Sequence, residues 1–254
     1  MHKNDTAPFS RWDIPLALVL LTRLPLPRLP DQAFARQSQA AWAYPLAGLV
    51  VGALACGVGW IAIWAQLPLF AIATLLVAVL IIATGAMHED GLADTADGLW
   101  GGFTTERRLE IMKDSHIGTY GVLALMFFQL LRIAAVVTLV GANLLTGVLA
   151  ACMFSRAVMP ALMHALPNAR NSGLSHSVGA PPLFAVLAGI GLAILLALLL
   201  LGAQAVLPMI CALFAAAIVA RIARIKIGGQ TGDILGAAQQ VSEIVFLLAL
   251  TALI

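Results

Sequence analysis

The stretch HEDGLADTADGLWGG, residues 88–102, follows directly on ATLLVAVLIIATGAM, residues 73–87, which carries no charged side chain. The first stretch gathers four carboxylates, one imidazole and four glycines. An uncharged run of this length is typical of a helix buried in a lipid bilayer, whereas carboxylates are costly there. The junction between the two stretches therefore predicts a membrane helix that ends at a polar face, where the chemistry of the protein is concentrated.

The composition supports a membrane protein over its whole length. Hydrophobic residues make up 61% of the 254 residues and charged residues 10%, and the mean hydropathy is +0.99. This balance excludes an ordinary soluble domain, and no basic surface suggests a nucleic-acid partner. We expect a single membrane-embedded domain, residues 1–254, folded as an all-α, polytopic bundle of helices.

Apolar runs predict where the chain crosses the membrane. A helix needs about 20 apolar residues to cross a hydrocarbon core of about 30 Å. A shorter run, 14–24, is broken by Arg23 and Pro25 and predicts an interfacial or re-entrant helix. The seven predicted spans lie near 45–64, 67–87, 118–140, 143–166, 182–202, 204–222 and 234–254.

The connections between these runs alternate in charge, which predicts their orientation. The first forty residues hold five basic side chains, Lys3 among them, and the turns near 65, 141 and 203 hold none. The other connections with basic residues are 88–117, 167–181 with Arg170, and 221–232. The positive-inside rule places basic connections in the cytoplasm, so we expect the functional site to face the cytoplasm.

The carboxylates of the opening stretch predict a metal site. If the helix of the second span continues through them, Asp90, Asp94 and Asp97 stand at about 0°, 40° and −20° around its axis. Such carboxylates repel each other unless a cation lies between them, and their oxygens suit Mg²⁺ or Mn²⁺. We therefore predict that all three are catalytic residues and metal ligands. The alternative is a solvated, polar helix end just outside the membrane.

The segment that follows adds basic residues. RRLEIMKDSHIGTYG, residues 107–121, contributes Arg107, Arg108, Lys113 and Asp114. Glycines of the opening stretch let another backbone or a bulky substrate approach closely. Acidic and basic groups beside a membrane suggest phosphate chemistry, in which Arg or Lys binds a diphosphate bridged by a metal ion. These four residues are therefore candidates for substrate binding.

A second glycine-rich segment, GGQTGD at 228–233, precedes the last span. Glycine-rich backbone at a helix N-terminus can bind an anion. Alternatively Asp233 caps the final helix, and both interpretations can hold together. The candidate substrate-binding residues here are Arg224, Lys226, Gly229, Thr231 and Asp233.

Three ionisable residues, Arg132, Arg156 and Glu243, fall inside predicted spans. Such groups either pair within the bundle or line a polar cavity. We expect Arg156 to line a cavity and to bind substrate, whereas an intramembrane pair is at least as good an interpretation for Arg132 and Glu243. His88 is a candidate metal ligand or catalytic base, the alternative being a hydrogen-bonded interfacial histidine.

The long motifs of this chain resemble the cobalamin synthase family, the adenosylcobinamide-GDP ribazoletransferases of bacteria and archaea. The motifs are DGLADTADGLWGG (90–102), RRLEIMKDSHIGTYG (107–121) and GGQTGDILGA (228–237), with weaker likeness in TRLPLP (22–27), YPLAGLVVGA (44–53) and VFLLAL (245–250). One departure is Glu89, where the family pattern leads us to expect an apolar residue. The departure leaves the motif carboxylates in place and the role of Glu89 open.

The resemblance implies a function. A hydroxyl of α-ribazole, or of its 5′-phosphate, attacks the cobinamide-linked phosphate of adenosylcobinamide-GDP, and GMP leaves. The reaction needs Mg²⁺ and forms adenosylcobalamin or its 5′-phosphate, the last assembly step of the cofactor. The resemblance also implies a multi-pass protein of the bacterial inner membrane, in contact with the lipid bilayer and without a nucleic-acid partner. Whether it forms a homo-oligomer is left open.

Two other functions compete. CDP-alcohol phosphotransferases run the same class of reaction on membrane helices, but Asp90-Gly91 is followed here by Leu92 and not by their typical alanine-arginine pair. A transporter could use the ionisable residues within the spans. The acidic residues gather at one face, however, whereas carrier sites lie near the middle of the membrane.

Overall fold

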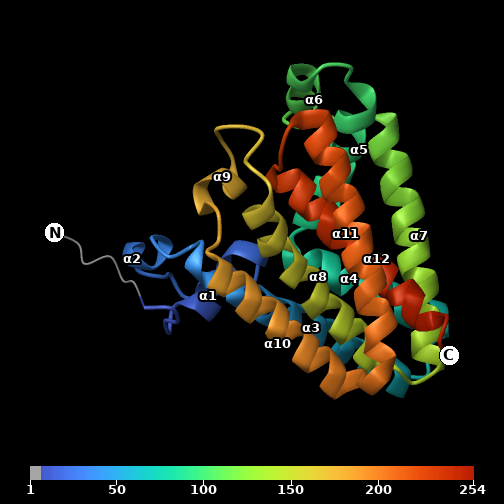
Figure 1. Ribbon diagram of the computed structural model, residues 1–254. Helices are drawn as coiled ribbons and strands as arrows, with labels where there is room; N and C mark the ends of the chain where they lie inside the picture. Colours follow the sequence, from blue (N-terminus) through green and yellow to red (C-terminus); the bar gives the residue numbers. More distant parts are fainter. Residues whose placement is uncertain (1–6) are drawn as a thin grey trace.

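The computed structural model describes residues 7–254, so Lys3 lies outside the described residues. It is built from helices alone (Figure 1). Residues 7–254 form no strand, and their one β-bridge joins Asn168 to Gln230. The predicted all-α class is confirmed.

The long apolar helices coincide with the predicted spans to within a few residues. They are α3 (Tyr44–Trp64), α4 (Leu69–Thr84), α7 (Thr119–Gly141), α8 (Leu145–Ala165), α10 (Leu183–Leu201), α11 (Val206–Ile227) and α12 (Gly232–Thr251). The shorter elements are α1 (Asp13–Leu21), α2 (Asp31–Phe34), η1 (Gln39–Ala43), α5 (Met87–Gly101), α6 (Thr105–Ile111), α9 (Leu174–Val178) and η2 (Gly202–Ala205). The short helix expected near 14–24 is α1, whose nine residues cannot cross a bilayer.

The described residues contain several helices that can cross a membrane, but they do not confirm the predicted number of seven spans. Five stretches have the required length and hydropathy, and a sixth is added if α4 and α5 together form one span. α4 has 16 residues and is about 24 Å long, shorter than the hydrocarbon core. α10 and α11 form one apolar stretch, Leu183–Ile227, yet they leave the turn at η2 in different directions (Figure 1). The count of seven stays a prediction.

Two helices form the centre of the bundle. Most residues of the apolar stretches of α8 and α12 are buried inside the protein, 78% and 72% respectively, compared with 22% for α7. Small residues let neighbouring helices approach this centre closely, as is common in membrane bundles. A methyl group at Gly48 on α3, for example, would overlap the carbonyl group of Cys152 on α8.

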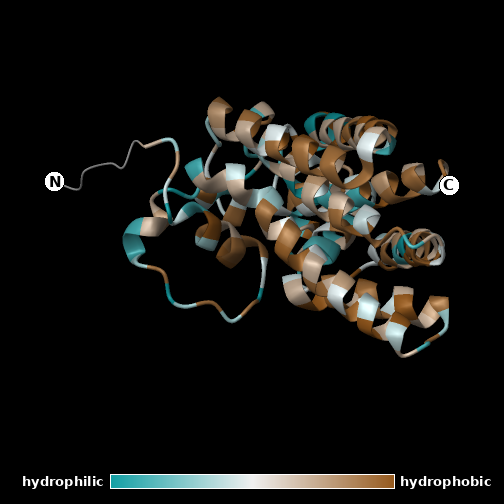
Figure 2. Ribbon diagram, turned by 90° about the horizontal axis from the view of Figure 1, so that it is seen from below, coloured by the Kyte–Doolittle hydropathy of each residue, from teal (hydrophilic) through white to brown (hydrophobic). Residues whose placement is uncertain are grey.

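The outer helices present hydrophobic side chains outward, and hydrophobic residues dominate the bundle when it is seen from below (Figure 2). Phe127 on α7 and Phe214 on α11 are more than half exposed. Such a surface is suited to lipid. The helix α5, with its ionisable residues, is not one of the five spanning stretches.

Candidate active site

The site begins at a break between α4 and α5. Gly85 and Ala86 have φ angles of 64° and 57°, in the left-handed region, and the two helices meet at 87°. Gly85 ends α4 in the conformation that glycine adopts most easily, and the amide of Ala86 bonds to the carbonyl of Ile81 at 2.9 Å. The prediction that one helix continues through the carboxylates is therefore wrong. The carboxylates still share a helix, because all three lie on α5.

α5 lies directly against the start of α12. A methyl group at Gly91 would lie 2.9 Å from the carbonyl oxygen of Asp233, and one at Gly236 would lie 3.3 Å from the Cα of His88. Both contacts are tighter than side chains normally allow, so two glycines are needed for this packing. Close approach of another backbone, one of the two roles expected for the motif glycines, is confirmed at Gly91. The packing places Asp233 beside α5.

The N-terminus of α12 is capped by a different residue from the one considered. Thr231 accepts a hydrogen bond from the amide of Ile234 at 3.3 Å and donates to Asp233 at 3.1 Å. The cap of α12 is therefore Thr231, and the interpretation of Asp233 as the cap is wrong. Asp233 instead pairs with Arg170, whose guanidinium nitrogen lies 3.2 Å from its carboxylate.

Gly229 is not open to a ligand. It is buried, and a methyl group there would overlap the carbonyl of Pro167. The amide of Gln230 donates to the same carbonyl at 2.8 Å, and the amide of Ala169 donates to the carbonyl of Gln230 at 2.8 Å. The glycine-rich segment thus packs against the segment before α9 and holds Arg170 near Asp233. The expected anion cradle at Gly229 is filled by protein.

A cavity of about 160 Å³ opens at this junction. Its polar lining includes Asp90, Asp233, Arg170, His88 and Tyr44. His88 is only 1% exposed, and its Nε2 has no hydrogen-bond partner among the described residues. An unpartnered buried nitrogen in the wall of a cavity is available to a bound molecule.

Negative charge is concentrated beside this cavity. Burial and, to a smaller extent, the neighbouring carboxylates of Asp90, Asp233 and Asp97 together raise the pKa of Asp94 to about 7, although Arg170 lowers it. Crowded carboxylate oxygens of this kind fit Mg²⁺. Residues 7–254 nevertheless contain no ready-made group of three acidic, histidine or cysteine side chains that could hold a metal ion by itself.

Asp97 has a different role from the one predicted. Its carboxylate is buried and accepts hydrogen bonds from the amides of Gly118 at 2.7 Å and Gly121 at 2.9 Å. It therefore caps the N-terminus of α7, where a negative charge is stabilised by the helix dipole. Both of its carboxylate oxygens are thereby hydrogen-bonded to the backbone at the start of α7, whereas Asp90, Asp94 and Asp233 lie together beside the cavity.

A buried network of charges lies behind α5. Arg132 contacts Glu243 and also Glu89, the latter at 3.0 Å, and Arg156 lies 3.6 Å from Glu243. Gln240 donates to Glu89 at 3.1 Å. The Arg132–Glu243 pair confirms the intramembrane interpretation, whereas Arg156 lies in this network and not in the cavity where it was expected. Glu89, whose role was open, anchors α5 to α7 and α12.

The other predicted substrate-binding residues do not line the cavity. Arg107 pairs with Glu110 at 3.0 Å on the surface of α6. Lys113 and Asp114 are exposed in the loop between α6 and α7, and Arg224 is exposed on α11.

Arg108 and Lys226 meet on another side of α5. Arg108 donates to the carbonyl of Lys226 at 2.9 Å. The ammonium group of Lys226 lies 4.3 Å from the ring centre of Trp100 and donates to the carbonyl of Leu99 at 2.7 Å.

The sequence did not identify three residues of the cavity: Arg170, Ser175 and Tyr44. Arg170 was noticed only as a basic loop residue. Arg170 is the one Lys or Arg of the 167–181 connection, and this positive charge beside the membrane is the signal in the sequence that points to it. Ser175 donates to Gln230 at 2.6 Å, and no signal in the sequence pointed to it. Tyr44 begins the stretch YPLAGLVVGA, which forms part of the family resemblance but suggested no role for this residue.

The fold and the cavity define a helical membrane protein with an acidic polar site where two helices meet. A family described as "Cobalamin-5-phosphate synthase" matches residues 13–251. Three relatives named "Adenosylcobinamide-GDP ribazoletransferase" come from Bradyrhizobium diazoefficiens, Mesorhizobium japonicum and Brucella anthropi. They are 45%, 45% and 43% identical to this chain and cover 94%, 93% and 92% of it, and 93%, 91% and 94% of their own lengths. The chain belongs to this family. No solved structure matches it.

Proposed function

We propose that the protein is an adenosylcobinamide-GDP ribazoletransferase. It transfers the adenosylcobinamide-phosphate group of adenosylcobinamide-GDP to α-ribazole or its 5′-phosphate, releases GMP and forms adenosylcobalamin or its 5′-phosphate. The names of the relatives support this proposal. The observation that carries it is that motifs 90–102 and 228–237, distant in the sequence, pack through Gly91 and Gly236 around one acidic cavity.

We further propose that the enzyme depends on Mg²⁺ held by Asp90, Asp94 and Asp233. Mg²⁺ takes its ligands from carboxylates, water and substrate phosphates. No group of three such side chains in residues 7–254 is arranged to hold an ion by itself, so phosphate oxygens of the donor would complete the ligand set. When bound, the ion offsets negative charge on the diphosphate of the donor.

The protein side chains have distinct roles in the proposed reaction. Arg170, positioned by Asp233, binds a phosphate oxygen of the donor. His88, through its unpartnered Nε2, accepts the proton of the attacking hydroxyl group. The hydroxyl oxygen forms a bond to the cobinamide-linked phosphorus, the bond from that phosphorus to the GMP oxygen breaks, and GMP leaves with the electron pair.

The setting of this reaction is also a proposal. The basic connections favour a bacterial inner membrane protein whose cavity faces the cytoplasm. A homo-oligomer stays open. The exposed residues Arg107, Lys113, Asp114 and Arg224 remain candidates for the more distant parts of the donor.

The test is an assay of purified protein in lipid vesicles with adenosylcobinamide-GDP, α-ribazole and Mg²⁺. We expect GMP and a cobalamin product in equal amounts. Formation of CMP from a CDP-alcohol, without GMP from the corrinoid donor, would instead support the rival phosphotransferase. Transport of a solute without either reaction would support the rival transporter.

A pair of variants tests the cavity as the donor site. Arg170→Gln should raise the donor KM several-fold, because Arg170 is the cation that lines the cavity. Arg28→Gln removes an equal charge from an exposed loop position and should leave the KM unchanged. Equal effects of the two changes would contradict the placement of the donor.

A further inference from the structure

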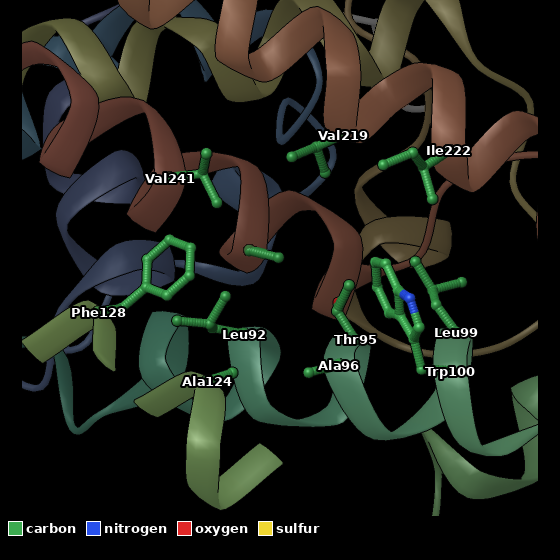
Figure 3. A pocket seen from close by; sticks show the side chains of 11 residues that line it. Leu92, Thr95, Ala96, Leu99, Trp100, Ala124, Phe128, Val219, Ile222 and Val241 are labelled. Carbon is green, nitrogen blue, oxygen red and sulfur yellow. The ribbon is translucent and has the colours of Figure 1, made fainter. Parts of the chain in front are cut away.

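A second pocket lies on the side of α5 that faces away from the acidic cavity. Around the axis of α5, Leu92, Thr95 and Leu99 stand about 140–200° from Asp90. The pocket has a volume of about 250 Å³, and its walls come from α5, α7, α11 and α12. Its lining is almost entirely apolar, with Phe128 and Val219 facing the same space as the α5 residues (Figure 3). The catalytic proposal does not use this pocket.

The pocket is placed within reach of lipid. α12 packs against both α7 and α11, and the pocket lies in the angle between these two outer helices. Their other faces carry exposed apolar side chains such as Phe127 and Phe214. Pockets that enclose drug-sized molecules measure roughly 300–1,000 Å³. The smaller volume here suits a single slender apolar chain and excludes a corrinoid.

Two observations indicate that the occupant has a polar, negatively charged end. Thr95 lines the pocket, is 5% exposed, and its hydroxyl has no hydrogen-bond partner among residues 7–254. Trp100 lies at one end of the pocket, five residues after Thr95 on α5; the ammonium group of Lys226 lies over its ring, and Arg108 donates a hydrogen bond to the backbone carbonyl of Lys226. Within the part of the chain that the structure describes, neither cation has a carboxylate partner. Basic pockets between membrane helices are recognised by anionic lipid headgroups.

We propose that this pocket binds one anionic phospholipid from the bilayer. An acyl chain fills the space between α7 and α11, an ester oxygen accepts a hydrogen bond from Thr95, and the phosphate lies at Lys226 and Arg108. An ammonium group has three donors, so Lys226 can keep its bond to Leu99. Lys226 and Arg108 are thereby assigned to a lipid phosphate and not to the donor. The lipid would support α5 from behind, and this proposal does not depend on the transferase reaction.

The test uses the full chain in phosphatidylcholine vesicles that contain a trace of phosphatidylglycerol with a photoreactive acyl chain. We expect crosslinks in the peptides that contain Leu92–Trp100 and Val219. Ala124→Phe fills the pocket from α7 and should reduce these crosslinks several-fold. Ala134→Phe adds the same bulk at an exposed position of the same helix and should not reduce them. Lys226→Gln should weaken the preference for phosphatidylglycerol over an equally photoreactive phosphatidylcholine.

Crosslinks spread evenly over the outer faces of α7 and α11, and equal in both α7 variants, would overturn the proposal. So would loss of the Trp100 crosslink when adenosylcobinamide-GDP is added, because the basic end would then belong to the donor. If Ala124→Phe does not fold, competition on the unchanged protein decides. Unlabelled phosphatidylglycerol should displace the probe more strongly than phosphatidylcholine does, and equal displacement would contradict a built site.

Discussion

At the scale of single residues, neighbours on one helix can have unrelated roles. Asp94 and Asp97 lie one turn apart on α5, yet Asp94 lies beside other carboxylates whereas Asp97 caps α7. The helical spacing predicted that they share a face, and they do share a helix. It could not predict the capping, because the amides of Gly118 and Gly121 come to Asp97 only through tertiary packing. Helical spacing could not predict the role of Arg170 for the same reason, because its pairing with Asp233 depends on the bridge from Asn168 to Gln230.

Glu89 tests the buried charge network at this scale. Two arginines and two glutamates balance each other there, and Glu89→Gln would leave a net positive charge inside the bundle. Breaking a buried pair costs about 3–5 kcal/mol. We therefore expect a clear drop in the thermal unfolding temperature of the detergent-purified protein.

Two further variants serve as controls for that measurement. Glu110→Gln breaks a solvent-exposed pair with Arg107 and should have little effect on stability. The double change Glu89→Gln with Arg132→Gln removes one charge of each sign, so it should cost less than the sum of the single changes. Strict additivity would show that Glu89 and Arg132 do not interact.

At the scale of helices, hydropathy predicted positions and bounds well, because burial in lipid requires long apolar runs. It did not predict the bend at Gly85 and Ala86, which depends on two left-handed residues and on the contact of α5 with α12. Because of the bend, α5 runs at 87° to α4 instead of continuing it. The acidic cavity exists only because of that turn.

The contact between α5 and α12 can be tested with a single methyl group. Gly91→Ala would push the Asp233 backbone away from α5, since the added carbon would lie 2.9 Å from a carbonyl oxygen that cannot move alone. We expect GMP release to fall by at least about tenfold, which corresponds to about 1.4 kcal/mol in the barrier. Gly191→Ala on α10 meets open space and should retain activity. A fully active Gly91→Ala protein would contradict the role of this packing.

At the scale of the whole molecule, the distribution of charge fixes the expected orientation. The alternating basic and neutral connections predict that 88–117, 167–181 and 221–232 face the cytoplasm. The number of spans affects this prediction, because each additional crossing reverses the side on which the following loop lies. The sequence predicts seven spans, whereas the structure gives five or six stretches of sufficient length, since α4 is short and α10 and α11 form one apolar stretch.

Labelling of single cysteines in intact cells tests this orientation. Thr105 is an exposed residue at the start of α6, so Thr105→Cys, in a chain whose three native cysteines are replaced, should be accessible to reagents. We expect it to react with a membrane-permeant maleimide and to resist an impermeant one until the cells are opened. A cysteine in place of Gln66, in the turn between α3 and α4, should react with the impermeant maleimide in intact cells. Labelling of Thr105→Cys from outside would reverse the orientation.

In the proposed Mg²⁺ site, Asp94 and not Asp97 is a ligand of the ion on which the donor would be bound. The most direct measurement is GMP release by Asp94→Asn and Asp97→Asn proteins in vesicles as Mg²⁺ is varied. Asp94→Asn should lower activity by orders of magnitude and raise the Mg²⁺ concentration required, because a carboxylate ligand is lost. Asp97→Asn weakens a helix cap, so it should reduce stability and leave the Mg²⁺ requirement unchanged. Near-normal GMP release by Asp94→Asn at limiting Mg²⁺ would contradict the account.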